Sequence, residues 1–258
     1  GMVRLMRMPQ AGGNPERLVA ERGSVGSWAL AADGTVAFAF TSATSPAELW
    51  LRAPSGNARA LTTLNREVLG TRTLAEVESL TFRSFDGLEI EAFLTRPVGV
   101  TTTQKYPLVA MIHGGPHGQQ GPGFNQKAQA YAAQGLASLM VNYRGSTGYG
   151  QKLADAIFQD QNGGEAKDVL AGVVAALAKY PWLDDSRLGV EGGSYGGQLT
   201  NWLITQTDRF KAAIPAAGIS NLVSFTYMAY YHDYLAVEFG GFPHEPFEPK
   251  NSTIWPRS

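Results

Sequence analysis

Hydrophobic and polar residues alternate in short segments along the first part of the chain, up to about residue 74. The alternating segments are residues 28–31, 35–41, 48–52 and 59–62. Turn-forming residues separate them at Asp33-Gly34, at Ser45-Pro46 and at 54–56. A period of two between such turns predicts an antiparallel meander of about four strands. A single meander cannot bury both of its faces, so it is expected to be the remnant of a larger array or to pack on the next domain. An independent β-appendage is the alternative.

From about residue 80 the pattern changes to strands that alternate with helices, which is typical of a parallel sheet. Residues 80–85 and 88–96 alternate around Asp86-Gly87 and predict a hairpin at the edge of that sheet. Short apolar runs suited to strands buried on both faces follow at residues 108–113, 137–143, 187–191 and 212–215. Helices are predicted at residues 125–134, 165–179 and 195–205. In the second helix one apolar stripe contains Val169, Leu170, Val173, Val174 and Leu177.

The composition is that of an ordinary globular protein, with 44% hydrophobic residues and a formal net charge of -1. The balanced charge argues against a nucleic-acid partner, and no apolar run is long enough to cross a membrane. The chain has no cysteine, and its four histidines are dispersed, so neither a metal site nor a cofactor is expected. No targeting signal is visible, and the expected location is cytoplasmic.

The strongest chemical signal follows the predicted strand 187–191. There the sequence Gly192-Gly193-Ser194-Tyr195-Gly196 matches the G-x-S-x-G nucleophile elbow, with a strand before it and a helix after it. Glycines flank the serine because a Cβ at those positions would collide with the neighbouring strand or helix. A glycine-rich phosphate-binding turn is the alternative, but the chain has neither G-x-G-x-x-G nor a Lys-Ser/Thr pair after the glycines. Ser194 is therefore the candidate nucleophile.

A second motif, His113-Gly114-Gly115-Pro116, follows the predicted strand 108–113. Hydrolases with a nucleophile elbow place one oxyanion donor in this loop and take the other from the residue after the nucleophile. The backbone N–H groups of Gly115 and Tyr195 are therefore the expected oxyanion donors, and each typically contributes about 3 kcal/mol. For His113 a structural role in the loop is preferred over that of a general base.

These motifs, together with residues 142–150 (NYRGSTGYG) and 210–224 (FKAAIPAAGISNLVS), resemble the prolyl oligopeptidase family of serine peptidases, nearest its acylaminoacyl-peptidase branch. The resemblance covers residues 75–258. It implies an α/β-hydrolase catalytic domain, incomplete at the C-terminus, preceded over residues 1–74 by a β segment that resembles the last blade of a β-propeller. It also implies that Leu222, Phe225 and Tyr227 line an apolar substrate pocket, for which ordinary helix packing is the alternative. Arg144 is expected to be structural, buried and held by backbone carbonyls.

A serine nucleophile needs a histidine base and a carboxylate, which in this fold follow the nucleophile after later strands. Only one further strand, residues 212–215, is predicted after Ser194. The chain is therefore expected to be a fragment that is inactive alone, completed by a missing C-terminal segment or by a second chain. The alternative is a compressed triad formed by Asp208 with His232, or by Asp233 or Glu238 with His244.

The leading function is hydrolysis of short peptides, of the acylaminoacyl- or dipeptidyl-peptidase type. A carboxylesterase acting on small esters would share the elbow and the oxyanion loop. A non-catalytic binding or assembly module is the third reading, and further sequence carrying the Asp and the His would eliminate it.

Overall fold

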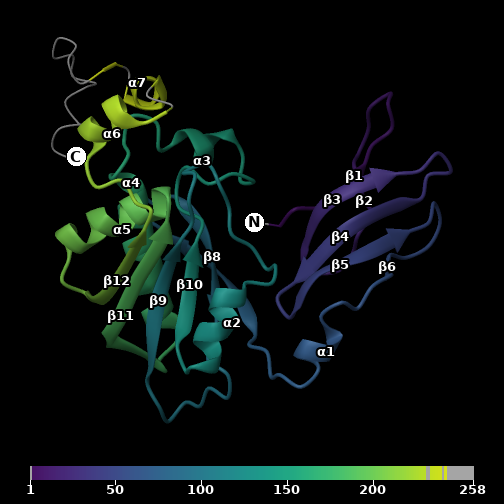
Figure 1. The fold of residues 1–258 in the computed structure, drawn as a ribbon, viewed down its shortest axis with the longest axis horizontal. Helices are drawn as coiled ribbons and strands as arrows, with labels where there is room; N and C mark the ends of the chain where they lie inside the picture. Colours follow the sequence, from purple (N-terminus) through teal and green to yellow (C-terminus); the bar gives the residue numbers. More distant parts are fainter. Residues whose placement is uncertain (1, 231–232, 240, 243–258) are drawn as a thin grey trace.

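The computed structural model describes residues 2–230, 233–239 and 241–242, which fold around three β-sheets (Figure 1). The strands are β1 (Met6–Arg7), β2 (Glu16–Arg17), β3 (Ser24–Leu30), β4 (Val36–Ser42), β5 (Ser45–Arg52), β6 (Arg59–Ala60), β7 (Val77–Arg83), β8 (Glu89–Thr95), β9 (Tyr106–Ile112), β10 (Ala137–Val141), β11 (Leu183–Gly193) and β12 (Phe210–Ala216). The helices are α1 (Arg66–Leu69), α2 (Gln126–Ala133), α3 (Gln151–Asp155), α4 (Gly164–Lys179), α5 (Tyr195–Gln206), α6 (Leu222–Met228) and α7 (Asp233–Phe239).

The meander predicted in the first part of the chain is present as the antiparallel sheet β3-β4-β5-β6. Phe38 and Phe40 of β4 form its small core, and the partly buried Trp50 packs against them. One predicted turn is misplaced, because Ser45 and Pro46 begin β5 and the turn lies at residues 43–44. Proline is tolerated at the start of a strand, where its missing N–H costs little.

The larger sheet has the strand order β12-β11-β9-β10-β8-β7. Strands β9 to β12 run parallel to one another, while β8 pairs antiparallel with both β10 and β7. The predicted hairpin is β7–β8, and strands form at all four predicted central positions. The prediction that all four are buried on both faces is wrong for β12, which is mostly exposed, with Ile214 56% exposed. Among the described residues β12 is the outer strand of this sheet and pairs with β11 on one side, which explains its exposure. Every residue of β10 is buried, as a strand covered on both faces requires.

Helices cover the two faces of this sheet. Helices α4 and α5 pack on the face to which Leu108, Ala110 and Ile112 of β9 contribute. Helix α2 packs on the other face, where its Ala128 meets Met111. The apolar stripe predicted for the second helix differs in part, because Val174 is half exposed. Compared with the predicted stripe, the observed buried face of α4 contains smaller residues and two carboxylates. Its buried positions are Gly164, Glu165, Ala166, Asp168, Val169, Gly172, Val173 and Ala176.

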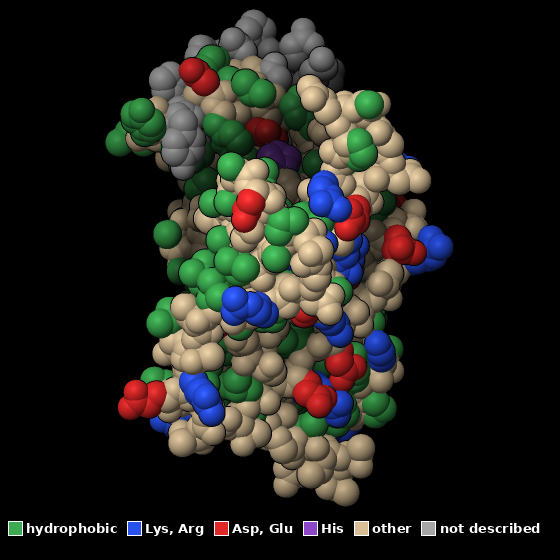
Figure 2. Space-filling model, turned by 90° about the vertical axis from the view of Figure 1, so that its right-hand side faces the viewer, with side chains coloured by type: hydrophobic (Ala, Val, Ile, Leu, Met, Phe, Trp, Pro, Cys, Tyr) green, Lys and Arg blue, Asp and Glu red, His purple; other side chains and the backbone are tan. Residues whose placement is uncertain are grey.

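The two larger sheets lie beside one another (Figure 1). Phe124 N donates to Thr41 Oγ1 at 3.0 Å, and Gln129 Nε2 donates to Ala43 O at 3.2 Å. The predicted domain boundary at residues 74/75 falls between α1 and β7. The face on the side of the smaller sheet mixes basic and acidic side chains without a field of one sign (Figure 2). Across the described residues, no helix combines the length and the apolar character needed to span a membrane.

Candidate active site

Ser194 occupies the turn between β11 and α5. Its backbone has φ of 57° and ψ of -121°, a conformation that non-glycine residues rarely adopt and that clusters at functional sites. Two backbone bonds hold this turn: Ser194 N donates to Ala216 O, and Gln198 N donates to Ser194 O, both at 3.0 Å. The serine is exposed, and among the described residues its Oγ makes no hydrogen bond. The side chain therefore projects from the sheet instead of packing into it.

The glycines of the elbow permit backbones to approach one another. A Cβ on Gly192 would lie 2.3 Å from Gly196 O, and a Cβ on Gly196 would lie 2.2 Å from Ile112 O. Gly193, by contrast, has open space where a Cβ would project. The two fixed glycines of the G-x-S-x-G motif are thus required by packing, whereas the glycine at its variable position is not.

The loop that follows β9 lies against the elbow. A Cβ on Gly114 would lie 3.0 Å from Gly193 O and 3.4 Å from Ser194 Cβ, so the loop and the serine are in direct contact. Gly115 is exposed, with φ of 131°, a conformation that favours glycine. Tyr195 is the first residue of α5, so its N–H belongs to the turn whose donors lack partners within the helix. The structure thus brings Gly115, Ser194 and Tyr195 to one edge of the sheet.

His113 uses both ring nitrogens within the loop, which agrees with the structural role expected from the sequence. Its Nδ1 lies 2.8 Å from Gly114 O, and its Nε2 lies 2.9 Å from Ser146 Oγ. Its ring stacks on Tyr143 with centroids 4.3 Å apart. Burial lowers the pKa of His113 to about 4, which keeps the imidazole neutral at physiological pH. His117, for which the sequence suggests no role, has its Nδ1 2.9 Å from Gly145 O.

Neither described histidine is hydrogen-bonded to Ser194. For the compressed triad, His232 and His244 lie outside the described residues, and so does the segment from residue 243 onwards. Of the acidic candidates, Glu238 is buried in α7, where its Oε2 accepts from Gln161 Nε2 at 3.4 Å. No group of three metal-ligating side chains is found in the part of the chain that the structure describes.

The three residues expected to line a substrate pocket all lie on α6. Leu222 is buried against Phe239 of α7, and Phe225 is partly buried in the same cluster. Tyr227 is 52% exposed. Leu222 also lines a cavity of about 320 Å³ together with Gln198 and Trp202 of α5. Two of the three side chains therefore pack between α6 and α7, and their contact with substrate stays a prediction.

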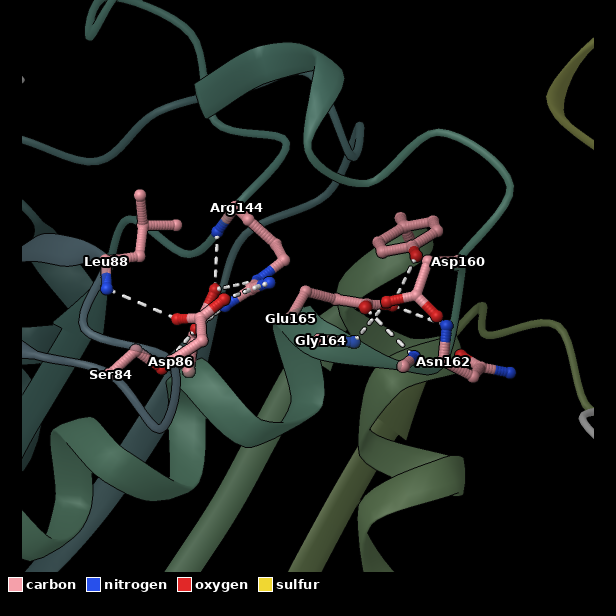
Figure 3. A network of polar contacts seen from close by, with 11 residues as sticks. Ser84, Asp86, Leu88, Arg144, Asp160, Asn162, Gly164 and Glu165 are labelled. Atoms are coloured by element: carbon pink, nitrogen blue, oxygen red, sulfur yellow. Dashed lines mark hydrogen bonds and ion pairs between the residues drawn. The ribbon is translucent and has the colours of Figure 1, made fainter. Parts of the chain in front are cut away.

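Arg144 is buried, as expected, but its partners are carboxylates and not backbone carbonyls. Its Nε and Nη2 donate to Asp168 of α4 at 2.8 and 2.9 Å, and its Nη1 lies 3.0 Å from Asp86 (Figure 3). A guanidinium that leaves water needs a compensating charge, which neutral carbonyls do not supply. The sequence-based expectation of carbonyl partners was wrong for this reason.

A second buried carboxylate on α4, Glu165, went unnoticed in the sequence. Its Oε1 accepts from Tyr195 Oη at 2.8 Å and from the backbone N–H of Asn162, and its Oε2 accepts from Gly163 N at 3.0 Å (Figure 3). Burial raises the pKa of Glu165 to about 7. The available signal was the pair Glu165 and Asp168, two acids three residues apart at the start of a helix that packs on a sheet.

The raised pKa predicts a pH-dependent stability. The folded state binds a proton at Glu165 more tightly than the unfolded state, so this group's favourable contribution is complete below about pH 4.5 and is lost as pH rises through about 7. The free energy of unfolding should fall by up to about 3 kcal/mol over this window. Urea unfolding between pH 4.5 and 8 measures this fall. Glu165→Gln should flatten the profile, whereas Glu67→Gln, at an exposed position on α1, should leave it unchanged.

Two features define an α/β-hydrolase fold. The third and fourth strands of the larger sheet, β9 and β10, exchange places in the strand order. An exposed serine lies in the turn between a strand and a helix, beside the loop after β9. An acylaminoacyl peptidase solved in complex with Z-Gly-Gly-Phe-chloromethyl ketone superposes on 95% of this chain and 38% of its own, with a TM-score of 0.85 and 30% identity. The sequence profile of the prolyl oligopeptidase family matches residues 122–252. The chain belongs to the prolyl oligopeptidase family.

Curated relatives agree with this assignment. The uncharacterized peptidase YuxL of Bacillus subtilis is 39% identical over 180 residues, which cover 70% of this chain and 27% of that protein. Dipeptidyl-peptidase 5 of Porphyromonas gingivalis is 33% identical over 171 residues, covering 65% of this chain and 25% of that protein. The chain thus spans about a quarter of the length of these relatives.

Proposed function

We propose that the chain is part of a serine peptidase that hydrolyses short peptides, with Ser194 as the nucleophile. The observation that carries the proposal is the exposed Ser194 at φ of 57°, in contact with the glycine loop after β9. Ser194 Oγ attacks the scissile carbonyl, and the backbone N–H groups of Gly115 and Tyr195 stabilise the negative charge that develops on its oxygen. The N-terminus of α5 adds a positive potential at the same place.

The serine proton needs an acceptor, and neither described histidine is hydrogen-bonded to Ser194. We propose that the base and its orienting carboxylate lie outside the described residues, in further sequence of the same polypeptide or in a second chain. The expected order in this fold, nucleophile first and then acid and base, supports this arrangement. Taken alone, the chain is expected not to hydrolyse peptides.

The substrate class is proposed from the relatives. Their names include an acylaminoacyl peptidase and a dipeptidyl-peptidase. The complex with Z-Gly-Gly-Phe-chloromethyl ketone has a phenylalanine next to its reactive group, which supports an apolar pocket beside the nucleophile. In this chain we assign that pocket to Leu222, Phe225 and Tyr227 of α6.

The test compares the native gene product with the isolated chain. The gene product should cleave N-acetylaminoacyl or dipeptidyl p-nitroanilides and be labelled at Ser194 by a fluorophosphonate probe. The isolated chain should be labelled at least about 100-fold more slowly, because general-base assistance is worth at least that factor. Fast labelling of the isolated chain would place the base within it. Cleavage of matched esters but not of the amides would favour an esterase.

A further inference from the structure

The carboxylate of Glu165 connects the start of α4 to the first residue of α5. Glu165 is fully buried, and its Oε1 accepts a hydrogen bond of 2.8 Å from the hydroxyl of Tyr195, which is also buried. This hydrogen bond becomes charge-assisted, and so stronger, when Glu165 is ionised. Tyr195 is also the residue whose backbone N–H is assigned to the oxyanion. Its side chain is therefore bound by Glu165, while its backbone N–H is available to the substrate.

The Tyr195 ring continues this framework towards the second donor. It stacks on Tyr143 with centroids 6.5 Å apart, and Tyr143 in turn stacks on His113 and donates to His113 O at 2.7 Å. His113 begins the loop that contains Gly115. Both assigned amide donors therefore belong to segments held by one buried cluster, with Glu165 at its end.

We propose that Glu165 is a positioning residue: by holding the phenol of Tyr195, it fixes the direction of the Tyr195 backbone N–H towards the oxyanion. This inference rests on the proposed function of Ser194. An oxyanion donor acts only if it points to the place where charge develops, and small displacements of catalytic groups cost large factors in rate. Without the hydrogen bond, the ring of Tyr195 is held by packing alone, and the first peptide of α5 gains freedom.

Glu165 also binds the backbone N–H groups of Asn162 and Gly163, so it stabilises the preceding loop as well. Tyr195→Phe isolates the proposed role, because it removes the phenol and leaves the carboxylate and the loop contacts in place. The chain offers a matched control at the other end of α4, where Tyr180 Oη donates to Glu78 Oε2 at 3.0 Å. Tyr180→Phe removes the same type of hydrogen bond far from Ser194.

The first experiment measures activity in the native gene product. Tyr195→Phe should lower kcat at least about tenfold with KM changed less than about twofold, because oxyanion stabilisation acts in the transition state and not in substrate binding. Tyr180→Phe should leave both constants within about twofold of the wild type. Equal behaviour of the two variants, when Ser194→Ala is inactive, would overturn the positioning role while the proposed function stands. Full activity of Ser194→Ala would overturn the proposed function itself.

The second experiment needs no activity and uses the isolated chain with 15N-labelled tyrosine. The Tyr195 amide resonance should shift with a midpoint near pH 7 as Glu165 titrates, and Glu165→Gln should abolish the shift. The ionisable neighbours of the Tyr195 phenol, besides Glu165, are Tyr143 and Tyr234. Asp160, Asp168 and Arg144 belong to the adjoining contacts of α4 (Figure 3). These groups remain in Glu165→Gln, so the variant isolates the contribution of Glu165.

With 15N-phenylalanine in Tyr195→Phe, the residue 195 amide should lose most of its pH response, because the phenol that transmits the change is gone. An undiminished response would show that the amide senses the charge of Glu165 through space, and the positioning role would be wrong. If the Tyr195 amide resonance of the wild type does not shift with pH, the positioning role is also wrong. This outcome can be read even if Tyr195→Phe does not fold.

Discussion

Ser194→Ala is expected to lower kcat/KM for peptide hydrolysis by the native gene product by at least about 10⁴-fold. In serine peptidases, removal of the nucleophile leaves only the residual catalysis that oxyanion stabilisation and binding supply. The alanine side chain fits the same space, and the turn is held by backbone bonds to Ala216 O and from Gln198 N, so the fold should be unaffected. The measurement is kcat/KM for a chromogenic peptide amide, together with fluorophosphonate labelling.

The control for this variant lies on the same strand. Ser186 of β11 is exposed and hydrogen-bonds to Asp184, away from the elbow. Ser186→Ala should keep kcat/KM within about twofold of the wild type and cost little stability, as exposed substitutions do. A Ser194→Ala enzyme with normal turnover would show that another residue is the nucleophile, and the assignment of Gly115 and Tyr195 as oxyanion donors would fall with it.

The elements that the sequence predicted well are those with a local cause. A buried strand is read from a short apolar run, and the elbow is read from glycines that contacts with Ile112 O and Gly196 O make necessary. The β7–β8 hairpin follows from Asp86-Gly87, where Gly87 has φ of 85°. In each case the residues that determine the structure are close together in the sequence.

The features that the sequence did not predict depend on contacts between distant segments. Arg144 meets Asp168 across 24 residues, and Tyr195 meets Glu165 across 30. An apolar pattern shows that a helix face is buried, but it does not show that an acid on that face has a cationic or phenolic partner. The same limit explains why the apolar pattern puts Val174 on the buried stripe of α4, whereas the structure buries Glu165 and Asp168 and leaves Val174 half exposed.

Asp168→Ala should destabilise the protein by about 3–5 kcal/mol, the typical cost of removing one partner of a buried ion pair. Asp168 is fully buried and accepts from Arg144 Nε, Nη2 and backbone N, and from the Ser84 hydroxyl. Without it, the guanidinium keeps its ion pair with Asp86, whose side chain is 40% exposed, and its contact with the Phe85 ring, while a backbone N–H loses its acceptor. Urea unfolding measures the change as a lower midpoint.

A matched pair separates burial from charge as the cause of this loss. Asp185 also binds an arginine, since Arg209 Nη2 lies 3.6 Å from its Oδ2, but both side chains are exposed, by 61% and 41%. Water and salt screen such a pair, so Asp185→Ala should cost no more than about 1 kcal/mol. If the two variants were destabilised equally, the Arg144–Asp168 pair would not anchor α4 to the sheet. Since α4 also carries Glu165, loss of this anchor should loosen the contact between Glu165 and Tyr195 before the sheet itself unfolds.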